Sequence, residues 1–280
     1  MARGSATREA GAQKAADRDD QLLSFDRRKQ ILERVNRKRS ATVDSLAGAF
    51  GVSRMTVIRD LERLETEGLL KRVRGGAVSL AHIVVAPPAS ASMRALTEEQ
   101  KRIAVEASRR IANGDFIILE SGSTCLALAE RLFEKDNLKI ATASPIIATR
   151  LAEIAESYNR RFEIILAGGI LSISKNFVMG PTAVQMFEHI NVDVAFLSAT
   201  AIDSESGMTA DDVNESAVSR TILERCARKK IGVIRSVKFN KSSFYKVADI
   251  TAFDEIITDK GLDRQTAQLF SSRGVKMTLC

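Results

Sequence analysis

The chain of 280 residues contains no tryptophan, two tyrosines, two histidines and three cysteines. With so few aromatic rings, little surface is available for stacking unpaired bases, which counts against an RNA-binding or single-strand-binding protein. No apolar run approaches the roughly 18 residues that a membrane-spanning helix needs. Residues 1–21 lack the apolar segment of a secretory signal. We therefore expect a cytoplasmic protein that has no membrane partner.

Metal-binding side chains are also scarce. The three cysteines, Cys125, Cys226 and Cys280, lie too far apart to form a CxxC motif. Together with two histidines they cannot supply a recognisable zinc cluster. Incidental thiols in a reducing cytosol are the simpler interpretation of these residues. The sequence predicts neither a metal site nor a cofactor.

The length and the composition allow two domains. Hydrophobic residues make up 45% of the chain, which is ordinary for a globular protein. Residues 1–24 are rich in alanine, glycine and charge, which predicts a disordered extension; a cloning residue or a start-site artefact is the alternative. Residues 81–95 contain Pro87 and Pro88 among small side chains, which indicates a linker. The predicted domains are residues 25–80 and residues 96–280.

Basic charge is concentrated in residues 25–80. This segment has 13 Lys and Arg against 7 Asp and Glu, a net charge of +6, while the whole chain carries +7. Positive charge gathered on one small domain is typical of a protein that binds the phosphate backbone of DNA. A helical bundle that packs against another protein is the alternative, and the charge argues against it.

The segment from Val52 to Ala77 predicts a recognition helix followed by a β-wing. Ser53 can cap the helix through its hydroxyl, and Val57, Leu61 and Leu64 recur at helical spacing and should face inward. Polar residues of the helix and arginines of the wing stay exposed, where a groove-bound domain contacts bases and phosphates. The predicted DNA-binding residues are Ser53, Arg54, Thr56, Arg59, Arg63, Arg72 and Arg74.

The preceding residues complete a helix-turn-helix. Ile31, Leu32 and Val35 form one apolar stripe, and Gly51 allows the sharp turn before the recognition helix. We expect a first helix at residues 26–39, a turn at 40–43, a second helix at 44–50, a turn at 51–52 and the recognition helix at 53–67. The wing should consist of a strand at residues 69–74, a turn at 75–76 and a return strand at 77–80.

Apolar strands and amphipathic helices alternate after the linker. Thr97 with Gln100 predicts a capping box at the first helix, and Pro145 predicts the start of another. Continuous apolar strands between amphipathic helices indicate a parallel sheet covered on both faces, in a Rossmann-like α/β domain. The expected helices are residues 97–112, 123–135, 145–157, 183–189 and 215–227, and the expected strands are residues 116–119, 140–142, 162–167, 192–198, 231–234 and 256–258.

One strand-end loop, residues 120–124, has the composition of an anion site. Gly122 allows close approach of the backbone, and the N–H groups, three hydroxyls and the positive helix end can cradle an anion. A turn that merely caps the helix is the alternative, and the end of a Walker A loop is missing. Other strand-end loops meet at the same edge of a parallel sheet. The predicted effector-binding residues are Ser121, Gly122, Ser123, Thr124, Thr142, Gly168, Gly169, Asp203, Arg235 and Lys238.

Residues 28–78 resemble the DNA-binding domain of the DeoR family of bacterial transcriptional regulators, whose pattern is VS..T.RRDL..LE..G.L.R.HGGA. The matching residues are Val52, Ser53, Thr56, Arg59, Asp60, Leu61, Leu64, Gly68, Leu70, Arg72, Gly75, Gly76 and Ala77. Ile58 stands where a second arginine is usual, and Arg74 where histidine is usual. The resemblance implies a winged helix-turn-helix that binds operator DNA, while the operator sequence does not carry over.

Residues 96–261 resemble the sugar-phosphate sensor domain of the same family, which is similar in fold to ribose-5-phosphate isomerase and glucosamine-6-phosphate deaminase. An LDSGTT-like phosphate loop is matched by residues 119–124, and a DSSKF-like loop by residues 235–239. The resemblance implies that the first loop and Lys238 hold the anionic end of a sugar phosphate. Further matching residues are Gly168, Gly169, Gly180, Pro181, Asp193, Asp203, Gly207 and Glu215.

Three departures concern groups that would read the sugar hydroxyls or the opposite end of the ligand. Ala143 replaces a usual asparagine, Ser219 a usual basic residue, and Arg235 a usual aspartate. Arginine in place of aspartate exchanges an acceptor for a donor and inverts the local charge. Either the effector is a more acidic metabolite than a simple sugar phosphate, or ligand sensing is lost.

Together these features predict a ligand-responsive transcriptional regulator, by family habit a repressor of a carbohydrate-utilisation operon. Its partners would be double-stranded operator DNA and a sugar phosphate or similar anion. Because one recognition helix reads only a few base pairs, we also expect a homo-oligomer, either a dimer or a tetramer. A phosphosugar isomerase or deaminase fused to a DNA-binding domain is the alternative. That chemistry needs a general acid and base, and the pocket loops offer only Glu120, Asp203 and Glu215, so we predict no enzymatic activity.

Overall fold

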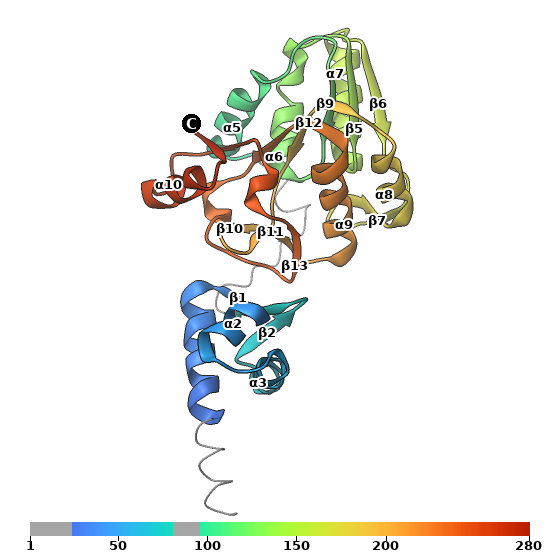
Figure 1. Cartoon of the computed structure of the whole chain (residues 1–280). Helices are drawn as coiled ribbons and strands as arrows, with labels where there is room; N and C mark the ends of the chain where they lie inside the picture. Colours follow the sequence, from blue (N-terminus) through green and yellow to red (C-terminus); the bar gives the residue numbers. More distant parts are fainter. Residues whose placement is uncertain (1–23, 81–95) are drawn as a thin grey trace, which may run out of the picture. The chain divides into compact units, whose positions relative to one another are not determined.

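The computed structural model describes residues 24–80 and 96–280, which form two compact units (Figure 1). The extension predicted before residue 24 and the linker predicted at residues 81–95 lie outside the described residues, and Ser24 already belongs to a helix. Among the described helices, none combines the length and the apolar character needed to cross a bilayer. In the same part of the chain, no three His, Cys, Asp or Glu side chains gather as a metal site.

The N-terminal unit is a winged helix-turn-helix. A helix of residues 24–38 is followed by β1 (Ser40–Thr42), α2 (Val43–Phe50), α3 (Arg54–Thr66), β2 (Leu70–Val73) and β3 (Gly76–Ser79). The inward stripe predicted for the recognition helix is confirmed, because Val57, Leu61 and Leu64 are buried. They share one core with Ile31, Val35, Val43, Leu46, Leu70 and Ala77.

The turn predicted at residues 40–43 is wrong. Ser40–Thr42 form strand β1, which pairs antiparallel with β3 and completes a three-stranded sheet in the order β1-β3-β2. This close pairing requires a glycine, because a Cβ atom on Gly76 would lie 2.2 Å from the carbonyl oxygen of Ala41. The residues around position 40 carry no strand signal of their own, since their partner lies at the far end of the domain.

The C-terminal unit is built around a seven-stranded sheet in the order β15-β14-β12-β9-β4-β5-β6. Every pairing in it is parallel, which confirms the predicted α/β fold class. Its strands are β4 (Phe116–Leu119), β5 (Leu138–Thr142), β6 (Phe162–Leu166), β9 (Val192–Leu197), β12 (Ala227–Val233), β14 (Glu255–Thr258) and β15 (Lys276–Leu279).

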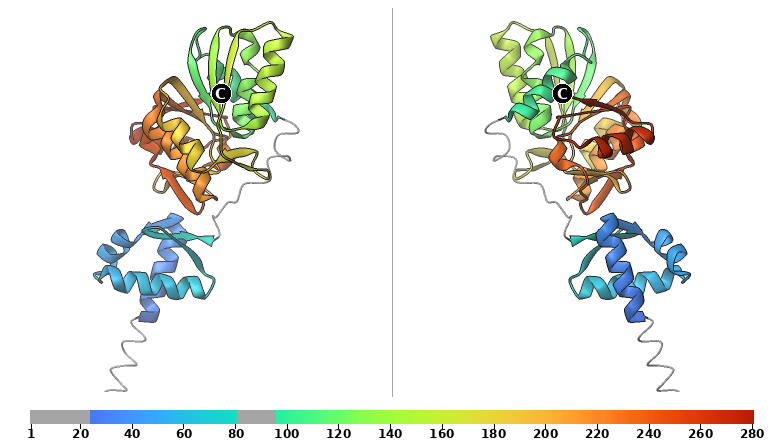
Figure 2. Two further views of the ribbon diagram at one scale, coloured as in Figure 1. Left: turned by 90° about the vertical axis from the view of Figure 1, so that its right-hand side faces the viewer. Right: turned by 90° about the vertical axis from the view of Figure 1, so that its left-hand side faces the viewer.

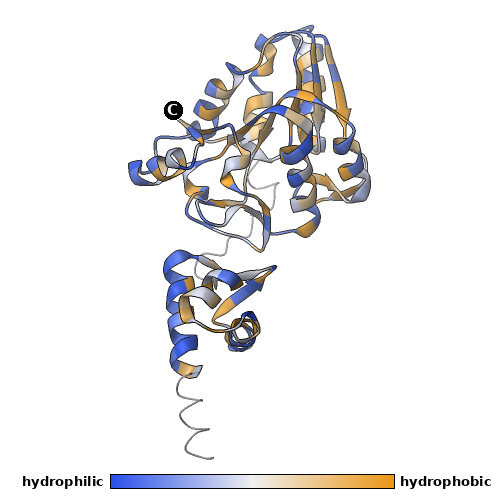
Figure 3. Cartoon of the chain, in the orientation of Figure 1, coloured by the Kyte–Doolittle hydropathy of each residue, from blue (hydrophilic) through white to orange (hydrophobic). Residues whose placement is uncertain are grey.

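Helices cover both faces of this sheet (Figure 2). The first core contains residues of α5 (Glu98–Ser108), α6 (Gly122–Ala129) and α7 (Pro145–Ser157), and the second contains residues of α8 (Pro181–Glu188), α9 (Val213–Thr221) and α10 (Arg264–Ser272). Ile117 and Leu119 of β4 join the first core, whereas Ile118 joins the second. Burial on both faces explains the continuous apolar strands (Figure 3).

Local signals located the starts of α5 and α7 correctly, whereas α8 and α9 begin two residues before the predicted positions. Thr97 and Gln100 form the predicted capping box, and Pro145 is the first residue of α7. Three predicted helices end early, and the first of them, α5, ends at Ser108 instead of residue 112. A 3-10 turn at Leu132–Glu134 follows α6, and a π-helical turn at Ile222–Cys226 follows α9.

Several short elements have no counterpart in the sequence prediction. A hairpin consists of β7 (Ile170–Ser172) and β8 (Phe177–Met179). A small antiparallel sheet consists of β10 (Ala201–Asp203), β11 (Gly207–Ala210) and β13 (Tyr245–Ala248). Helix α10 and strand β15 were not expected either. Strands of three or four residues are too short for a periodic apolar pattern.

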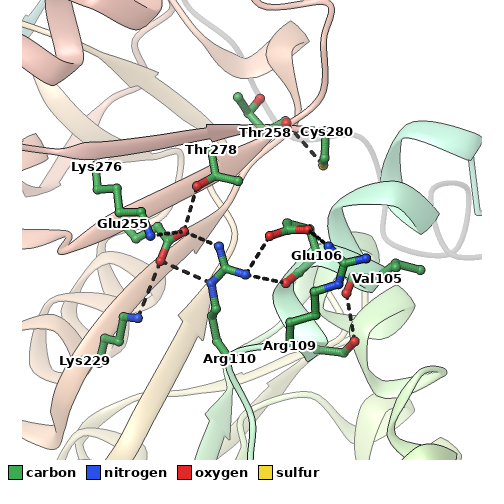
Figure 4. Close-up of polar contacts among 11 residues, drawn as sticks. Val105, Glu106, Arg109, Arg110, Lys229, Glu255, Thr258, Lys276, Thr278 and Cys280 are labelled. Atoms are coloured by element: carbon green, nitrogen blue, oxygen red, sulfur yellow. Dashed lines mark hydrogen bonds and ion pairs between the residues drawn. The ribbon is translucent and has the colours of Figure 1, made fainter.

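A buried ion cluster lies at the amino ends of the strands (Figure 4). Glu255 begins β14 and is fully buried, and its Oε1 atom lies 2.7 Å from Arg110 Nη2. The Nζ atoms of Lys276 and Lys229 lie 3.3 and 3.5 Å from the same carboxylate, and Thr278 Oγ1 donates to it at 2.8 Å. Because ligands of such sheets bind at the carboxyl ends of the strands, this cluster serves the fold.

Candidate DNA interface and effector site

The start of α3 is set by two hydroxyl groups. Ser53 is the N-cap, and its Oγ accepts a hydrogen bond from the backbone N–H of Thr56 at 3.1 Å. The two side-chain oxygens also lie 2.9 Å apart. The capping role predicted for Ser53 is confirmed, and its contact with DNA stays a prediction. Gly68 follows the helix with a φ of +69°, the left-handed conformation expected at this position.

The predicted DNA-contacting arginines divide into two groups. Arg54 pairs with Asp44, Arg63 with Glu67 and Arg72 with Glu62. Arg59 and Arg74 are exposed, and no ion pair of either is present among the described residues. Exposed pairs of this kind contribute less than about 1 kcal/mol, so a DNA phosphate can compete for the paired arginines. To bind Arg59 or Arg74, a phosphate would not have to displace a carboxylate of the described residues.

An internal ion pair holds the recognition helix in place. Asp60 is almost fully buried on the inner side of α3. Its carboxylate accepts hydrogen bonds from Arg27 Nε at 2.6 Å and from Arg27 Nη2 at 3.3 Å. This two-point contact joins the helix of residues 24–38 to α3 next to the exposed Arg59. Asp60 therefore positions the DNA-reading surface without belonging to it.

Arg59→Ala is expected to weaken operator binding by about 1–3 kcal/mol, because it removes one phosphate or guanine contact. The measurement is a titration of a selected operator fragment at fixed salt concentration. Arg109→Ala is the control, since Arg109 is an exposed arginine of the other unit and its loss changes the net charge equally. Equal affinities of the two variants would remove Arg59 from the interface.

The loop between β4 and α6 presents a helix N-terminus at the carboxyl edge of the sheet. Ser121 is the N-cap of α6, and its side chain makes no capping hydrogen bond. Gly122 has a φ of +87°, and a Cβ there would lie 3.2 Å from Ser198 Cβ at the end of β9. The loop is therefore not a turn that caps the helix through a hydroxyl. A helix N-terminus with the Ser121 hydroxyl beside it is suited to binding an anion.

The next two loop residues are more enclosed. Ser123 Oγ accepts a hydrogen bond from Gln100 Nε2 of α5, and Thr124 is 3% exposed. A bound anion would therefore meet backbone N–H groups here before it met free hydroxyls. Both residues stay predicted contacts.

Two other predicted effector residues brace their own loops. Thr142 is fully buried, and its Oγ1 donates to the Glu120 carbonyl at 3.2 Å and accepts from Ser144 N at 3.1 Å. Asp203 is 4% exposed, and its Oδ1 accepts from the N–H groups of Glu205 and Ser206. These contacts hold strand-end turns in shape.

Gly168 and Gly169, which follow β6, are exposed, but the fold requires a glycine at position 169. A Cβ on Gly169 would lie 2.5 Å from the Met179 carbonyl oxygen, and its φ is +141°. Gly169 thus allows β7 to pack against β8. Gly168 has no comparable close contact, and the role of either glycine in ligand binding stays a prediction.

After β12, Arg235 precedes a short 3-10 turn, Ser236–Lys238, and Lys238 is the last residue of that turn. Asp259 anchors this turn, because its carboxylate accepts from Ser236 N and Ser236 Oγ, each at 2.7 Å. Burial lowers the pKa of Lys238, and repulsion from Arg235 and Lys241 lowers it further. An anion bound between these cations would relieve the repulsion.

Sequence reasoning did not select Lys175 as a site residue. This side chain, from the turn between β7 and β8, forms ion pairs with Asp211 and with Glu215 at the start of α9, the latter at 2.7 Å. Asp212 caps α9, whereas the neighbouring Asp211 binds Lys175. No local signal could reveal a pair joined only by the folding of the β7–β8 hairpin onto α9.

Glu120 is a buried carboxyl group at the beginning of the loop. Burial and the nearby charge of Glu215 raise its pKa to about 8, against the opposing effect of a hydrogen bond from Ser219 Oγ. Glu120 is therefore mostly protonated at neutral pH and can donate a hydrogen bond. Ser219, which stands where the family pattern has a basic residue, leaves this acid without a counter-ion from that position.

The charge of Glu215 links the two predicted anion-binding loops. Its carboxylate acts electrostatically on Glu120 of the first loop and on Lys238 of the second. Both loops follow strands of the same parallel sheet, β4 and β12, which are separated only by β9, so both lie at the carboxyl edge of that sheet. An open surface hollow of about 310 Å³ lies elsewhere, between α6 and α7. It is lined by Leu126, Glu130, Pro145, Ile146, Thr149, Arg150 and Glu153.

Comparison with known families matches both units. Residues 27–82 match the DeoR-like helix-turn-helix domain, and residues 96–260 match the DeoR C terminal sensor domain. The HTH-type transcriptional regulator GlpR of Haloferax volcanii is 30% identical over 254 residues, which cover 91% of this chain and 97% of the relative. The glycerol-3-phosphate regulon repressor of Escherichia coli K12 is 28% identical over 250 residues, covering 89% and 96%.

Among solved structures, a D-ribose-5-phosphate isomerase in complex with phospho-erythronic acid is 17% identical, with a TM-score of 0.34. The match covers 50% of this chain and 52% of the isomerase chain.

Proposed function

The chain belongs to the DeoR family of DNA-binding transcriptional regulators, and on that premise we propose that it represses a carbohydrate-utilisation operon and responds to a phosphorylated sugar or a related anion. The family consists of regulators, so the alternative of an isomerase or deaminase is set aside. The protein would act in the cytoplasm, where operator DNA and phosphorylated metabolites are found.

One observation supports the anionic effector most strongly. The N-terminus of α6, where the Ser121 hydroxyl makes no capping bond and Gly122 is left-handed, lies at the same edge of the sheet as the half-buried Lys238. A helix N-terminus and an ammonium group both favour a phosphate, and burial strengthens their attraction. Two of the relatives bear the names glycerol-3-phosphate regulon repressor and putative aga operon transcriptional repressor.

The second end of the ligand would meet Arg235. Its charge already repels the ammonium of Lys238, so two anionic groups would neutralise the loop better than one. We infer that a sugar-acid phosphate or a bisphosphate fits this site better than a sugar phosphate whose phosphate is its only anionic group. Protonated Glu120 would add a hydrogen-bond donor for an oxygen of the ligand.

Response to the effector requires that it bind one population of the protein more tightly than another. A dimer or a tetramer provides such populations, because two recognition helices must be spaced to fit two half-sites on DNA. The effector would favour an arrangement that no longer fits. Differential affinity for the two arrangements sets the size of the response.

A combined ligand and operator assay tests this function. Sugar-acid phosphates at millimolar concentration should raise the melting temperature of the wild-type protein and weaken its binding to a selected operator, while the unphosphorylated sugars should do neither. Arg235→Asp should shift the preference towards ligands with a single anionic group. If no phosphorylated ligand changes either property, effector sensing is refuted. An unchanged ranking in Arg235→Asp refutes only the role of Arg235.

A further inference from the structure

Four large apolar side chains are exposed together around the β7–β8 hairpin. The exposed fractions are 45% for Leu166, 68% for Ile170, 48% for Leu171 and 86% for Ile173. Leu166 is the last residue of β6. Ile170 and Leu171 are the first two residues of β7, and Ile173 follows β7 directly. We refer to these four residues as the β7 patch. Clustered exposure of large aliphatic side chains marks an interaction surface more often than scattered exposure does.

The architecture of the hairpin places β7 on the outside. Strand β8 is buried and contacts α8 and α9, whereas β7 pairs only with β8 within the described sheets. Strand β6, which carries Leu166, is likewise an edge strand of the large sheet. Figure 1 shows β7 beside α8 and α9. Unpaired edges with exposed apolar side chains invite association with another chain.

The patch is presented by a fixed element. Asn176 Oδ1, in the turn, accepts hydrogen bonds from Ser144 Oγ at 3.2 Å and from Ile146 N at 3.0 Å, at the start of α7. Lys175 ties the same turn to Asp211 and Glu215 at the start of α9. A surface held in place before binding loses little conformational freedom when a partner covers it.

Charge favours a second copy of this chain as the partner. Residues 164–174 contain no charged side chain. In a two-fold contact each residue lies near its own counterpart, so any charge there would face a like charge. An uncharged patch avoids that repulsion. One operator needs two recognition helices, which independently requires a second copy of this chain.

We propose that the β7 patch is the surface through which two copies of this chain associate around a two-fold axis. This inference rests on the proposed function only in its requirement for two recognition helices. The contact buries Leu171 and Ile173, which are two positions apart and so lie on one face of the hairpin, against the same residues of the second copy. The ties from the hairpin turn to α7 and α9 then join the effector region to the interface of the dimer.

The test is a pair of charge insertions in the full-length protein. Leu171→Glu combined with Ile173→Glu should halve the mass measured by sedimentation at micromolar concentration, because four buried carboxylates would face one another. Operator affinity should fall by at least about tenfold as the second half-site is lost. Leu269→Glu is the matched control. Leu269 lies on α10 and is 46% exposed, and α10 contacts β15 at the opposite edge of the sheet.

Three results would overturn the proposal: a monomeric wild-type protein, a double variant of wild-type mass, or an equal loss of mass in Leu269→Glu. A patch covered by residues 81–95 of the same chain would give the second result.

A cross-linking experiment keeps the test valid if the double variant fails to fold. It places a cysteine at position 173 or at position 269 and adds a short bis-maleimide, which joins two cysteines that lie close together. Ile173→Cys should give a cross-linked dimer and Leu269→Cys should not, and an oligomeric protein without the Ile173→Cys product would also refute the interface.

This experiment separates the interface from the proposed function. If the interface is wrong but the function is right, the double variant keeps its mass and the wild type still responds to phosphorylated ligands. If the function is wrong, the wild type fails to bind operator or ligand whatever its mass.

Discussion

Gly122→Val is expected to abolish the effect of the phosphorylated ligand on operator binding while leaving operator binding itself unchanged. Gly122 has a φ of +87°, a conformation that costs a β-branched residue about 1–2 kcal/mol or more. Its new Cβ would lie 3.2 Å from Ser198 Cβ. The loop would have to shift, and its N–H groups would no longer converge on an anion. The measurement is operator affinity with and without the ligand that stabilises the wild type.

Gly114→Val supplies the matched control for this variant. Gly114 has a φ of +89°, and a Cβ at this position would lie 3.9 Å from its nearest neighbour, Asn137 Nδ2, so the backbone strain is similar. It precedes β4 at the amino edge of the sheet, away from the strand-end loops. Its melting temperature should fall as much as that of Gly122→Val, but its response to the ligand should persist. Loss of response in both variants would show that general destabilisation is responsible.

Lys238→Met tests the charge at the same site. The loss of one charge-assisted hydrogen bond, about 1.5–3 kcal/mol, corresponds to roughly a 10- to 100-fold loss in ligand affinity. Lys246→Met is the comparison, because Lys246 is an exposed lysine paired with Asp249. Equal affinities of the two variants would remove Lys238 from the site and leave the helix N-terminus as the whole of the anion contact.

Arg110→Met is expected to lower the free energy of unfolding of the C-terminal unit by about 3–5 kcal/mol. Arg110 is the two-point partner of the fully buried Glu255, and removal of one member of a buried pair leaves an uncompensated charge. Lys229 and Lys276 are more exposed and cannot replace the guanidinium geometry. Chemical denaturation at neutral pH measures the loss. Arg109→Met is the control, because its pair with Glu106 is exposed on the arginine side and should contribute less than about 1 kcal/mol.

The same pair predicts the response to acid. Burial alone would raise the pKa of Glu255, but hydrogen bonds from Arg110 and Thr278 outweigh burial and lower the pKa to about 2. As the pH falls, the carboxylate in the folded state therefore binds its proton at a lower pH than the carboxylate in the unfolded state does. Stability from this group is present above the ordinary carboxyl pKa of about 4.5 and is lost as the pH falls towards 2. In Arg110→Met this acid-dependent loss should shrink, and an undiminished loss would assign it to other carboxylates.

Features read correctly from the sequence are those with local causes. Ser53 and Thr97 cap the helices that follow them, and Pro145 begins α7. Each of these starts depends on a side chain reaching a backbone group two or three residues away, so the neighbouring residues contain the whole signal. The continuous apolar runs likewise predict strands buried on both faces.

The candidate site was only partly predictable, because some of its contacts join residues that are distant along the chain. The loop at residues 120–124 and Lys238 could be named, because the order of strand, loop and helix places such residues at one edge of a parallel sheet. Lys175 could not, because its partners Asp211 and Glu215 are brought to it only when the β7–β8 hairpin folds onto α9. Thr142 has the right composition for a ligand contact, yet its hydroxyl is engaged within its own loop.

The sequence by itself indicated the two domains, the recognition helix, the parallel sheet and the strand-end position of the loop that we predict to bind an anion. Helical periodicity, capping and apolar runs express energies between residues close along the chain. Only the tertiary structure decided that Ser40–Thr42 become the third strand of the wing and that β7 stands exposed beside α8 and α9. It also decided that Glu120 is buried next to Ser219. Short strands and buried carboxyls gain their stability from partners distant along the chain, and those contacts exist only once the chain has folded.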